Sequence, residues 1–225
     1  MEPLFLRTKL FVPSARPALV QRSRLIERLV PAHGPPLTLV CAPAGAGKTT
    51  LLREWIDVFH SPVAWLSLDE GDNDPTRFWT YIIAALQTVW NDFGANSLDS
   101  LRSPQTVPIE SVLAALINEI AGASDPLVLV LDDYHAVKTP AIHEAMAFLV
   151  DHLPPQLRIV ISSRVDPLLP LGRMRVRGQL LELREPDLRF TPEEASTFLN
   201  QVMGLGLSAL DIAALEARTE GWVAG

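Results

Sequence analysis

Apolar residues along the chain follow two spacings. Short runs in which they dominate have the length of buried β-strands, and such runs predict strands over residues 37–42, 63–68, 127–131, 158–162 and 180–183. Between these runs, apolar residues recur every three or four positions, as they do on one face of a helix. The alternation of strands and helices indicates an α/β fold with a parallel sheet flanked by helices.

Capping signals mark where several helices begin. Asp74 can cap a helix that has Pro75 at its first position. Residues 191–194, Thr-Pro-Glu-Glu, form a capping box, and Ser208 with Asp211 predicts the start of a further helix. Helices are therefore predicted over residues 48–59, 75–86, 108–121 and 140–152, and others begin near residues 23, 191 and 208.

Two polar stretches separate these elements. Residues 69–74 carry four acids and could hold a metal ion, but the capping role of Asp74 explains the stretch more simply. Residues 91–106 are rich in polar residues and contain Gly, Ser and Pro, so we predict a surface loop there.

The stretch after the first strand has the composition of a phosphate-binding loop. Residues 42–50 read APAGAGKTT and lead from a strand into a helix. Gly45 and Gly47 can take positive φ and let backbone N–H groups approach phosphate oxygens. Lys48 can reach the β- and γ-phosphates, and the Thr49 hydroxyl can ligate Mg²⁺. The residues predicted to contact the nucleotide in this loop are Pro43, Ala44, Gly45, Ala46, Gly47, Lys48, Thr49 and Thr50.

This loop departs from the usual pattern at one position. The pattern G-x-x-x-x-G-K-[ST] has glycine where this chain has Ala42. The alternative is an ordinary strand-to-helix turn with a solvated lysine. The apolar strand before the loop and the helical pattern after it favour the phosphate-binding interpretation.

A second candidate site feature follows the strand at residues 127–131. Asp132 and Asp133 come directly after this apolar run, where a P-loop ATPase needs an acid beside Mg²⁺. Asp132 is the predicted metal ligand together with Thr49, and Asp133 is the predicted base that orients or deprotonates the attacking water. An ordinary acidic turn is the alternative.

Two arginines complete the candidate site. Arg164 follows the strand at residues 158–162 and is the predicted sensor of the γ-phosphate, with a surface salt bridge as the alternative.

The other arginine lies in residues 1–31, which are locally basic. This segment could form a solvated arm, or its residues 20–22, which include Arg22, could fold over the nucleotide base. The five histidines form no zinc motif or nucleophile triad, so we expect them to be structural or exposed.

Composition narrows the class of protein. The 225 residues suffice for one large α/β domain, alone or with a piece of a second. A net charge of −7 argues against a nucleic-acid-binding surface. Cys41 is the only cysteine and lies in an apolar strand, which predicts a buried thiol and fits a cytoplasmic location. No run spans a membrane and no signal peptide is expected.

These motifs leave three functions open. A regulatory ATPase needs the loop and the paired acids. A small-molecule or nucleotide kinase would use the same loop with a cationic lid, for which Arg173, Arg175 and Arg177 are candidates. A nucleotide-binding fragment without turnover is the third possibility.

The chain resembles the nucleotide-binding domain of MalT-like STAND ATPases, regulators usually joined to a LuxR-type DNA-binding domain. The stretches that carry the resemblance include LRTKLFVP, LVQRSRLIERL, APAGAGKTTLL, LVLVLDDYHAV and TEGWVAG, and Ala42 fits that family's form of the loop. The resemblance implies a P-loop NTPase fold with a five-stranded parallel sheet in the order 5-1-4-3-2. It also implies roles for Asp132 at the metal, Asp133 in hydrolysis and Arg164 as a sensor.

The resemblance further implies a domain organisation and a function. Residues 1–189 would form the nucleotide-binding domain with its N-terminal arm, and residues 190–225 the beginning of a helical lid domain, cut short. ATP or ADP with Mg²⁺ would be the ligands. ADP would hold a resting form, ATP with an inducer would permit self-association of the full-length protein, and slow hydrolysis would reset it. DNA contact would need a domain absent from this sequence, and no membrane partner is expected.

Overall fold

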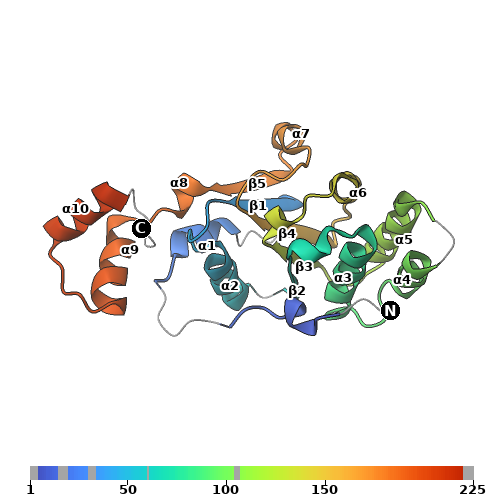
Figure 1. Ribbon diagram of the computed structural model, residues 1–225, viewed down its shortest axis with the longest axis horizontal. Helices are drawn as coiled ribbons and strands as arrows, with labels where there is room; N and C mark the ends of the chain where they lie inside the picture. The colour runs from blue at the N-terminus through green and yellow to red at the C-terminus, as the bar shows by residue number, and fades with distance from the viewer. Residues whose placement is uncertain (1–4, 15–19, 30–33, 60, 104–106, 220–225) are drawn as a thin grey trace.

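The computed structural model describes residues 5–14, 20–29, 34–59, 61–103 and 107–219. Its centre is a five-stranded parallel sheet in the order β2-β3-β4-β1-β5 (Figure 1). The strands are β1 (Leu37–Cys41), β2 (Val63–Ser67), β3 (Leu127–Asp132), β4 (Leu157–Ser163) and β5 (Leu180–Arg184). Read from its other edge, this is the predicted order 5-1-4-3-2, so the fold prediction is confirmed.

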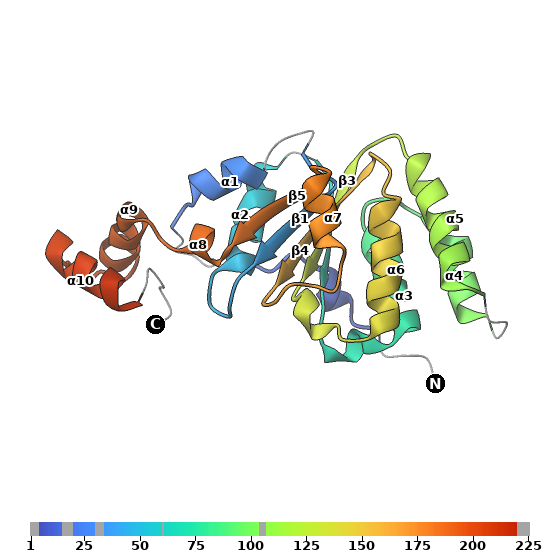
Figure 2. The same ribbon diagram turned by 90° about the horizontal axis from the view of Figure 1, so that it is seen from above.

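Helices connect the strands and cover both faces of the sheet (Figure 2). The α-helices are α1 (Ser23–Leu29), α2 (Lys48–Val58), α3 (Pro75–Gln87), α4 (Ala95–Arg102), α5 (Ile109–Ala121), α6 (Pro140–Asp151), α7 (Leu171–Val176), α8 (Glu185–Leu188), α9 (Pro192–Ser196) and α10 (Ala209–Thr219). Short 3₁₀ turns are η1 (Arg7–Leu10), η2 (Glu70–Asn73) and η3 (Tyr134–Ala136), and a π-helical segment, η4 (Thr197–Val202), follows α9.

Alternate residues of β3 pack on opposite faces of the sheet. Leu127, Leu129 and Leu131 belong to the core under α3, α5 and α6, whereas Val128 and Val130 belong to the core under α1 and α2. Every residue of β3 is buried, as expected for a central parallel strand. Because the strands are parallel, their carboxyl ends meet at one edge of the sheet, where the candidate site lies.

The predicted helix caps are confirmed. The Asp74 side chain accepts a hydrogen bond from Arg77 N, and Pro75 is the first residue of α3. Thr191 and Glu194 form the capping box of α9, and Ser208 pairs with Asp211 before α10. Cys41 is buried, also as predicted, and burial raises the pKa of its thiol.

The prediction of a surface loop over residues 91–106 is wrong for its central part. Residues 95–102 form α4, which begins after Gly94 in the left-handed conformation. Leu98 and Leu101, three positions apart, pack against the main core and hold this helix in place. Residues 104–106 lie outside the described residues. The helix α7 was not predicted either, since it spans only six residues.

The alternative of a solvated basic arm is wrong for two residues of the N-terminal segment. Lys9 is 7% exposed and pairs with Asp72, which has no exposed surface, and with Asp69 at 3.0 Å. Arg22 is also buried. Asp69 and Asp72 therefore bind side chains of the protein, and Asp74 caps α3. No cluster of three or more metal-ligating side chains is present among the residues described.

The C-terminal helices lie beyond one end of the sheet. Figures 1 and 2 both show α9 and α10 packed on each other and joined to β5 through α8. Arg24 of α1 contacts this connection, because its guanidinium donates to Asp187 O at 2.8 Å and pairs with Glu194. None of the helices in the described ranges is long and apolar enough to cross a membrane.

Candidate nucleotide-binding site

The loop between β1 and α2 has the backbone conformation that a phosphate cradle needs. Gly45 and Gly47 have φ of 81° and 77°, a region that residues with a side chain rarely adopt. Gly47 immediately precedes α2, so the first N–H groups of this eleven-residue helix lie behind the loop. A helix N-terminus with free N–H groups favours an anion at this point.

Lys48 bridges the two ends of the backbone turn at the start of the loop through hydrogen bonds to two carbonyl groups. Its Nζ donates to Ala42 O and to Pro43 O, both at 2.9 Å. The side chain is buried, and burial lowers the pKa of Lys48, while the charge of Asp133 acts in the opposite direction. A cation is thus positioned within the loop on two carbonyl groups that a phosphate can replace.

Thr49 and Asp132 join the loop to the end of β3. The Thr49 hydroxyl donates to Asp132 Oδ2 at 2.9 Å, and the Ser162 hydroxyl of β4 donates to the other carboxylate oxygen. Asp132 is 3% exposed, and burial raises the pKa of its carboxyl, opposed by these two hydrogen bonds. The hydroxyl and the carboxylate predicted to bind the metal therefore lie side by side.

Asp133 turns away from the sheet. Its φ of 56° is in the left-handed region, which ends the strand and directs the side chain outward, where it is 45% exposed. The charge of Asp133 acts on Lys48, so the two side chains share one site. An exposed carboxylate beside a phosphate-binding lysine can contact a water molecule or a substrate.

His135 is a site residue that sequence reasoning missed. Its Nδ1 lies 3.6 Å from Asp133 Oδ1 and has no hydrogen-bond partner among the described residues. Burial lowers the pKa of His135, and the charges of Asp133, Arg164 and Lys48 also act on it. Only its position two residues after Asp133 could have singled it out, because it belongs to no metal or nucleophile motif.

Arg164 follows the last residue of β4 and is exposed, at the edge of the sheet predicted for it. Its positive charge lowers the pKa of both Lys48 and His135, which places it in the same group of charges. Arg164 forms no ion pair within the described parts of the chain, so the surface salt bridge considered as an alternative is not observed.

Arg22 lies between the phosphate loop and the segment that leads to α9. Its guanidinium donates to Leu188 O and to Arg189 O, the latter at 3.2 Å, and covers the ring of Phe190 at 4.9 Å. A Cβ added at Gly47 would lie 3.8 Å from Arg22 Nη1. Burial lowers the pKa of Arg22. Arg22 is therefore next to the loop, and contact with a base remains a prediction.

The residues present fit a nucleotide with a magnesium ion. Mg²⁺ is usually held by one or two protein oxygens together with phosphate oxygens and water, so the Thr49 hydroxyl and the Asp132 carboxylate are a sufficient protein contribution. Gly45, Gly47 and Lys48 supply the donors that a polyphosphate requires.

The fold and the site together define a P-loop α/β nucleotide-binding domain. Residues 18–161 match the family described as the AAA ATPase domain, and the chain belongs to this family.

Curated relatives cover nearly the whole chain. It is 37% identical over 219 residues to the HTH-type transcriptional regulator MalT of Klebsiella pneumoniae subsp. pneumoniae, covering 97% of this chain and 24% of that protein. It is 41% identical over 197 residues to the MalT of Cronobacter sakazakii, covering 88% of this chain and 22% of that protein. The chain therefore spans about a quarter of the length of these relatives.

Two solved structures share the fold. A STAND protein with a tetratricopeptide repeat sensor from Pyrococcus horikoshii superposes with a TM-score of 0.63 at 16% identity, over 92% of this chain and 29% of that one. CDC6p from Pyrobaculum aerophilum superposes with a TM-score of 0.54 at 18% identity, over 91% of this chain and 55% of that one.

Proposed function

We propose that this domain is an ATP- and ADP-binding switch within a longer, signal-responsive transcriptional regulator. The observation that carries the proposal is the contact between Thr49 and Asp132, which joins the phosphate loop to the acidic strand. The similarity to the MalT proteins supports the regulatory role, since their names describe transcriptional regulators with a helix-turn-helix. DNA would be bound through a part of the protein that lies beyond this chain.

Each residue of the site has a proposed role in binding. Residues 43–50 hold the phosphates through backbone N–H groups, and Lys48 exchanges its two carbonyl partners for phosphate oxygens. Thr49 and Asp132 hold Mg²⁺, which would neutralise charge on the phosphates. Arg22 places residues 20–25 beside the nucleotide.

Hydrolysis is proposed to be slow and to involve three residues. Asp133 accepts a proton from the water whose oxygen attacks the γ-phosphorus, and the bond between that phosphorus and the bridging oxygen breaks to release ADP and phosphate. His135 Nδ1 lies 3.6 Å from Asp133 Oδ1, so a small movement would let it donate a hydrogen bond that orients this carboxylate. Arg164 distinguishes ATP from ADP by its attraction to the γ-phosphate.

The proposed switch uses the helical segment after residue 190. Arg22 and Arg24 both contact residues 187–194, and Arg22 also lies beside Gly47. Nucleotide binding at the phosphate loop can therefore change the position of residues 187–194. We propose that residues 190–225 begin a helical domain that closes over ADP, and that ATP favours an open form that self-associates in the whole protein.

The kinase alternative loses its main support. Arg173 pairs with Asp151, and Arg175 pairs with Glu182 through bonds of 2.5 and 2.9 Å. Two of the three candidate arginines thus connect α7 to its neighbours, whereas Arg177 is exposed and forms no ion pair among the described residues. The ion pairs of Arg173 and Arg175 weigh against a cationic lid that uses all three arginines.

The nucleotide that co-purifies with the protein tests the proposal. We expect ADP to be released on denaturation and identified by mass spectrometry. Protein that carries no nucleotide and binds neither added ADP nor added ATP would contradict the proposed function.

A further inference from the structure

Ser162 is a polar residue within the buried part of β4. It has no exposed surface, and β4 lies between β3 and β1 in the middle of the sheet. The three residues before it, Ile159, Val160 and Ile161, are apolar and buried as well. A hydroxyl in such a strand lowers stability unless it forms a hydrogen bond. The partner of this hydroxyl therefore indicates why a serine is present.

The partner is the carboxylate at the end of β3. Ser162 Oγ donates to Asp132 Oδ1, whereas the Thr49 hydroxyl donates to Asp132 Oδ2 at 2.9 Å. One carboxylate oxygen is thus held by β4 and the other by the first turn of α2. Because Leu131 pairs with Ile161 across β3 and β4, the register of these strands brings the next residue of each together.

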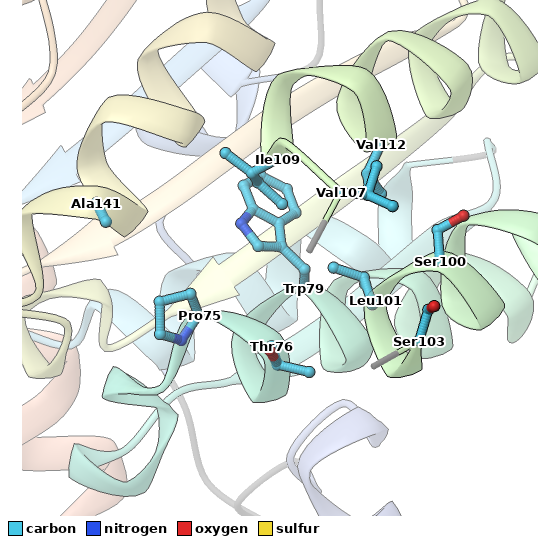
Figure 3. A pocket seen from close by; sticks show the side chains of 10 residues that line it. All are labelled: Pro75, Thr76, Trp79, Ser100, Leu101, Ser103, Val107, Ile109, Val112 and Ala141. Carbon is cyan, nitrogen blue, oxygen red and sulfur yellow. The ribbon is translucent and has the colours of Figure 1, made fainter. Parts of the chain in front are cut away.

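Two other serines use their hydroxyls differently. Ser163, the next residue in the chain, donates to Val165 O. Ser100 of α4, on the wall of the pocket shown in Figure 3, donates to Asn96 O at 2.9 Å. Bonds of this kind shape the local backbone. The bond from Ser162 instead joins residues 30 positions apart and ends on a residue of the nucleotide site.

A metal-binding carboxylate needs a partner that fixes its direction. The torsion that rotates the Asp132 carboxylate has only a broad, two-fold preference, so the side chain alone does not determine where Oδ2 points. Mg²⁺ requires nearly ideal octahedral geometry from its ligands. Groups that hydrogen-bond to a ligating carboxylate therefore contribute to metal affinity without touching the metal.

We propose that Ser162 is a positioning residue, whose hydroxyl fixes the Asp132 carboxylate so that Oδ2 faces Thr49 and the phosphate loop. This role rests on the proposed nucleotide-binding function, because it concerns the magnesium ion that would accompany ATP. Ser162 belongs to neither the phosphate-loop motif nor the acidic pair.

Calorimetric titration of ATP into the nucleotide-free protein, once with EDTA and once with Mg²⁺, tests this role. The quantity compared is the factor by which Mg²⁺ lowers the Kd. Ser162→Ala removes the hydroxyl, and Ser162→Thr keeps it. Ser163→Ala is the matched control, because it removes a neighbouring buried hydroxyl that bonds to Val165 O instead.

We expect Ser162→Ala to bind ATP in EDTA as tightly as the unchanged protein, since the phosphate loop is intact. The factor gained from Mg²⁺ should be about tenfold smaller, a usual cost of removing a hydrogen-bonding partner of a metal ligand. Ser162→Thr and Ser163→Ala should keep the full factor. A purely structural role for Ser162 would instead weaken binding in EDTA as well.

Three results would overturn the proposal. These are an unchanged Mg²⁺ factor in Ser162→Ala, an equal loss of the factor in Ser162→Ala and Ser163→Ala, or weaker binding by Ser162→Ala in EDTA to the same extent as with Mg²⁺. If the unchanged protein binds ATP in neither condition, the proposed function itself fails, and the role of Ser162 fails with it.

Discussion

The Thr49 hydroxyl donates a hydrogen bond of 2.9 Å to Asp132 Oδ2, and so joins residues that are 83 positions apart in the chain. Thr49 lies in the first turn of α2 and Asp132 is the last residue of β3, so the contact depends on the order of the strands. Both oxygens would face one metal ion beside the phosphate loop.

Replacing Asp132 tests the metal assignment. The Asp132→Asn variant keeps the shape of the side chain but loses the negative charge that Mg²⁺ requires. We expect Mg²⁺ to strengthen ATP binding in the unchanged protein and to have at least about tenfold less effect in the variant, a difference of roughly 1.4 kcal/mol. Calorimetric titrations with and without Mg²⁺ measure this, and an equal effect in both proteins would remove Asp132 from the metal site.

Replacing Asp133 separates binding from turnover. In a longer protein that contains this domain, Asp133→Asn should bind ATP as tightly as the parent, because the side chain is exposed and does not support the loop. Phosphate release should fall by about 10²–10⁴-fold, the usual contribution of a general base. Undiminished release would exclude Asp133 from the reaction.

We expect buried His143 to make the folded protein less stable in acid. Its Nδ1 lies 3.1 Å from the Tyr134 hydroxyl, and burial lowers its pKa below the ordinary value of 6.5. The unfolded chain therefore binds the proton first as the pH falls through 6.5, so stability decreases toward the lower pKa of the folded state. Thermal unfolding at about pH 7.5 and pH 5.5 should show a smaller decrease for His143→Gln than for the parent.

The exposed His152 supplies the control for that experiment. His152→Gln should show the same decrease as the unchanged protein. If His143→Gln and His152→Gln behave alike, His143 does not carry the acid sensitivity.

The buried pair of Lys9 and Asp72 is expected to stabilise the position of the N-terminal segment. Lys9→Met leaves Asp72, which has no exposed surface, with Arg77 at 3.3 Å as its remaining cation. We expect a loss of about 3 kcal/mol in the free energy of unfolding by urea. Lys138→Met is the matched control, because its ion pair is exposed and 3.8 Å long, and it should change stability by less than about 0.5 kcal/mol. Equal effects would contradict a structural role for Lys9.

The strands and the phosphate loop could be predicted because they depend on local patterns, whereas the order of the strands in the sheet followed from the family resemblance. The apolar strand before Gly45 and the capping of α3 by Asp74 are both encoded within a few residues. The partners of buried charges could not be predicted in this way. Lys9 and Asp72 are 63 positions apart, and Arg22 reaches carbonyl groups 166 positions away, so only the assembled fold brings them together.

Polar composition misled the prediction for α4. Residues 95–102 are mostly polar, yet Leu98 and Leu101 pack on the core and the segment is helical.

His135 was missed for a different reason. Its place in the site comes from the left-handed turn at Asp133, which no residue pattern specifies, because non-glycine residues rarely adopt that conformation.

The most direct test of the central claim is a calorimetric titration of ADP and ATP into the nucleotide-free protein and its Lys48→Ala variant. Lys48 is the buried cation of the loop, so its loss should weaken binding of both nucleotides by about 10–100-fold, which corresponds to a charged hydrogen bond of roughly 1.5–3 kcal/mol. Lys138→Ala, an exposed lysine, should bind like the parent. If Lys48→Ala binds both nucleotides as tightly as Lys138→Ala, the phosphate site is not at this loop.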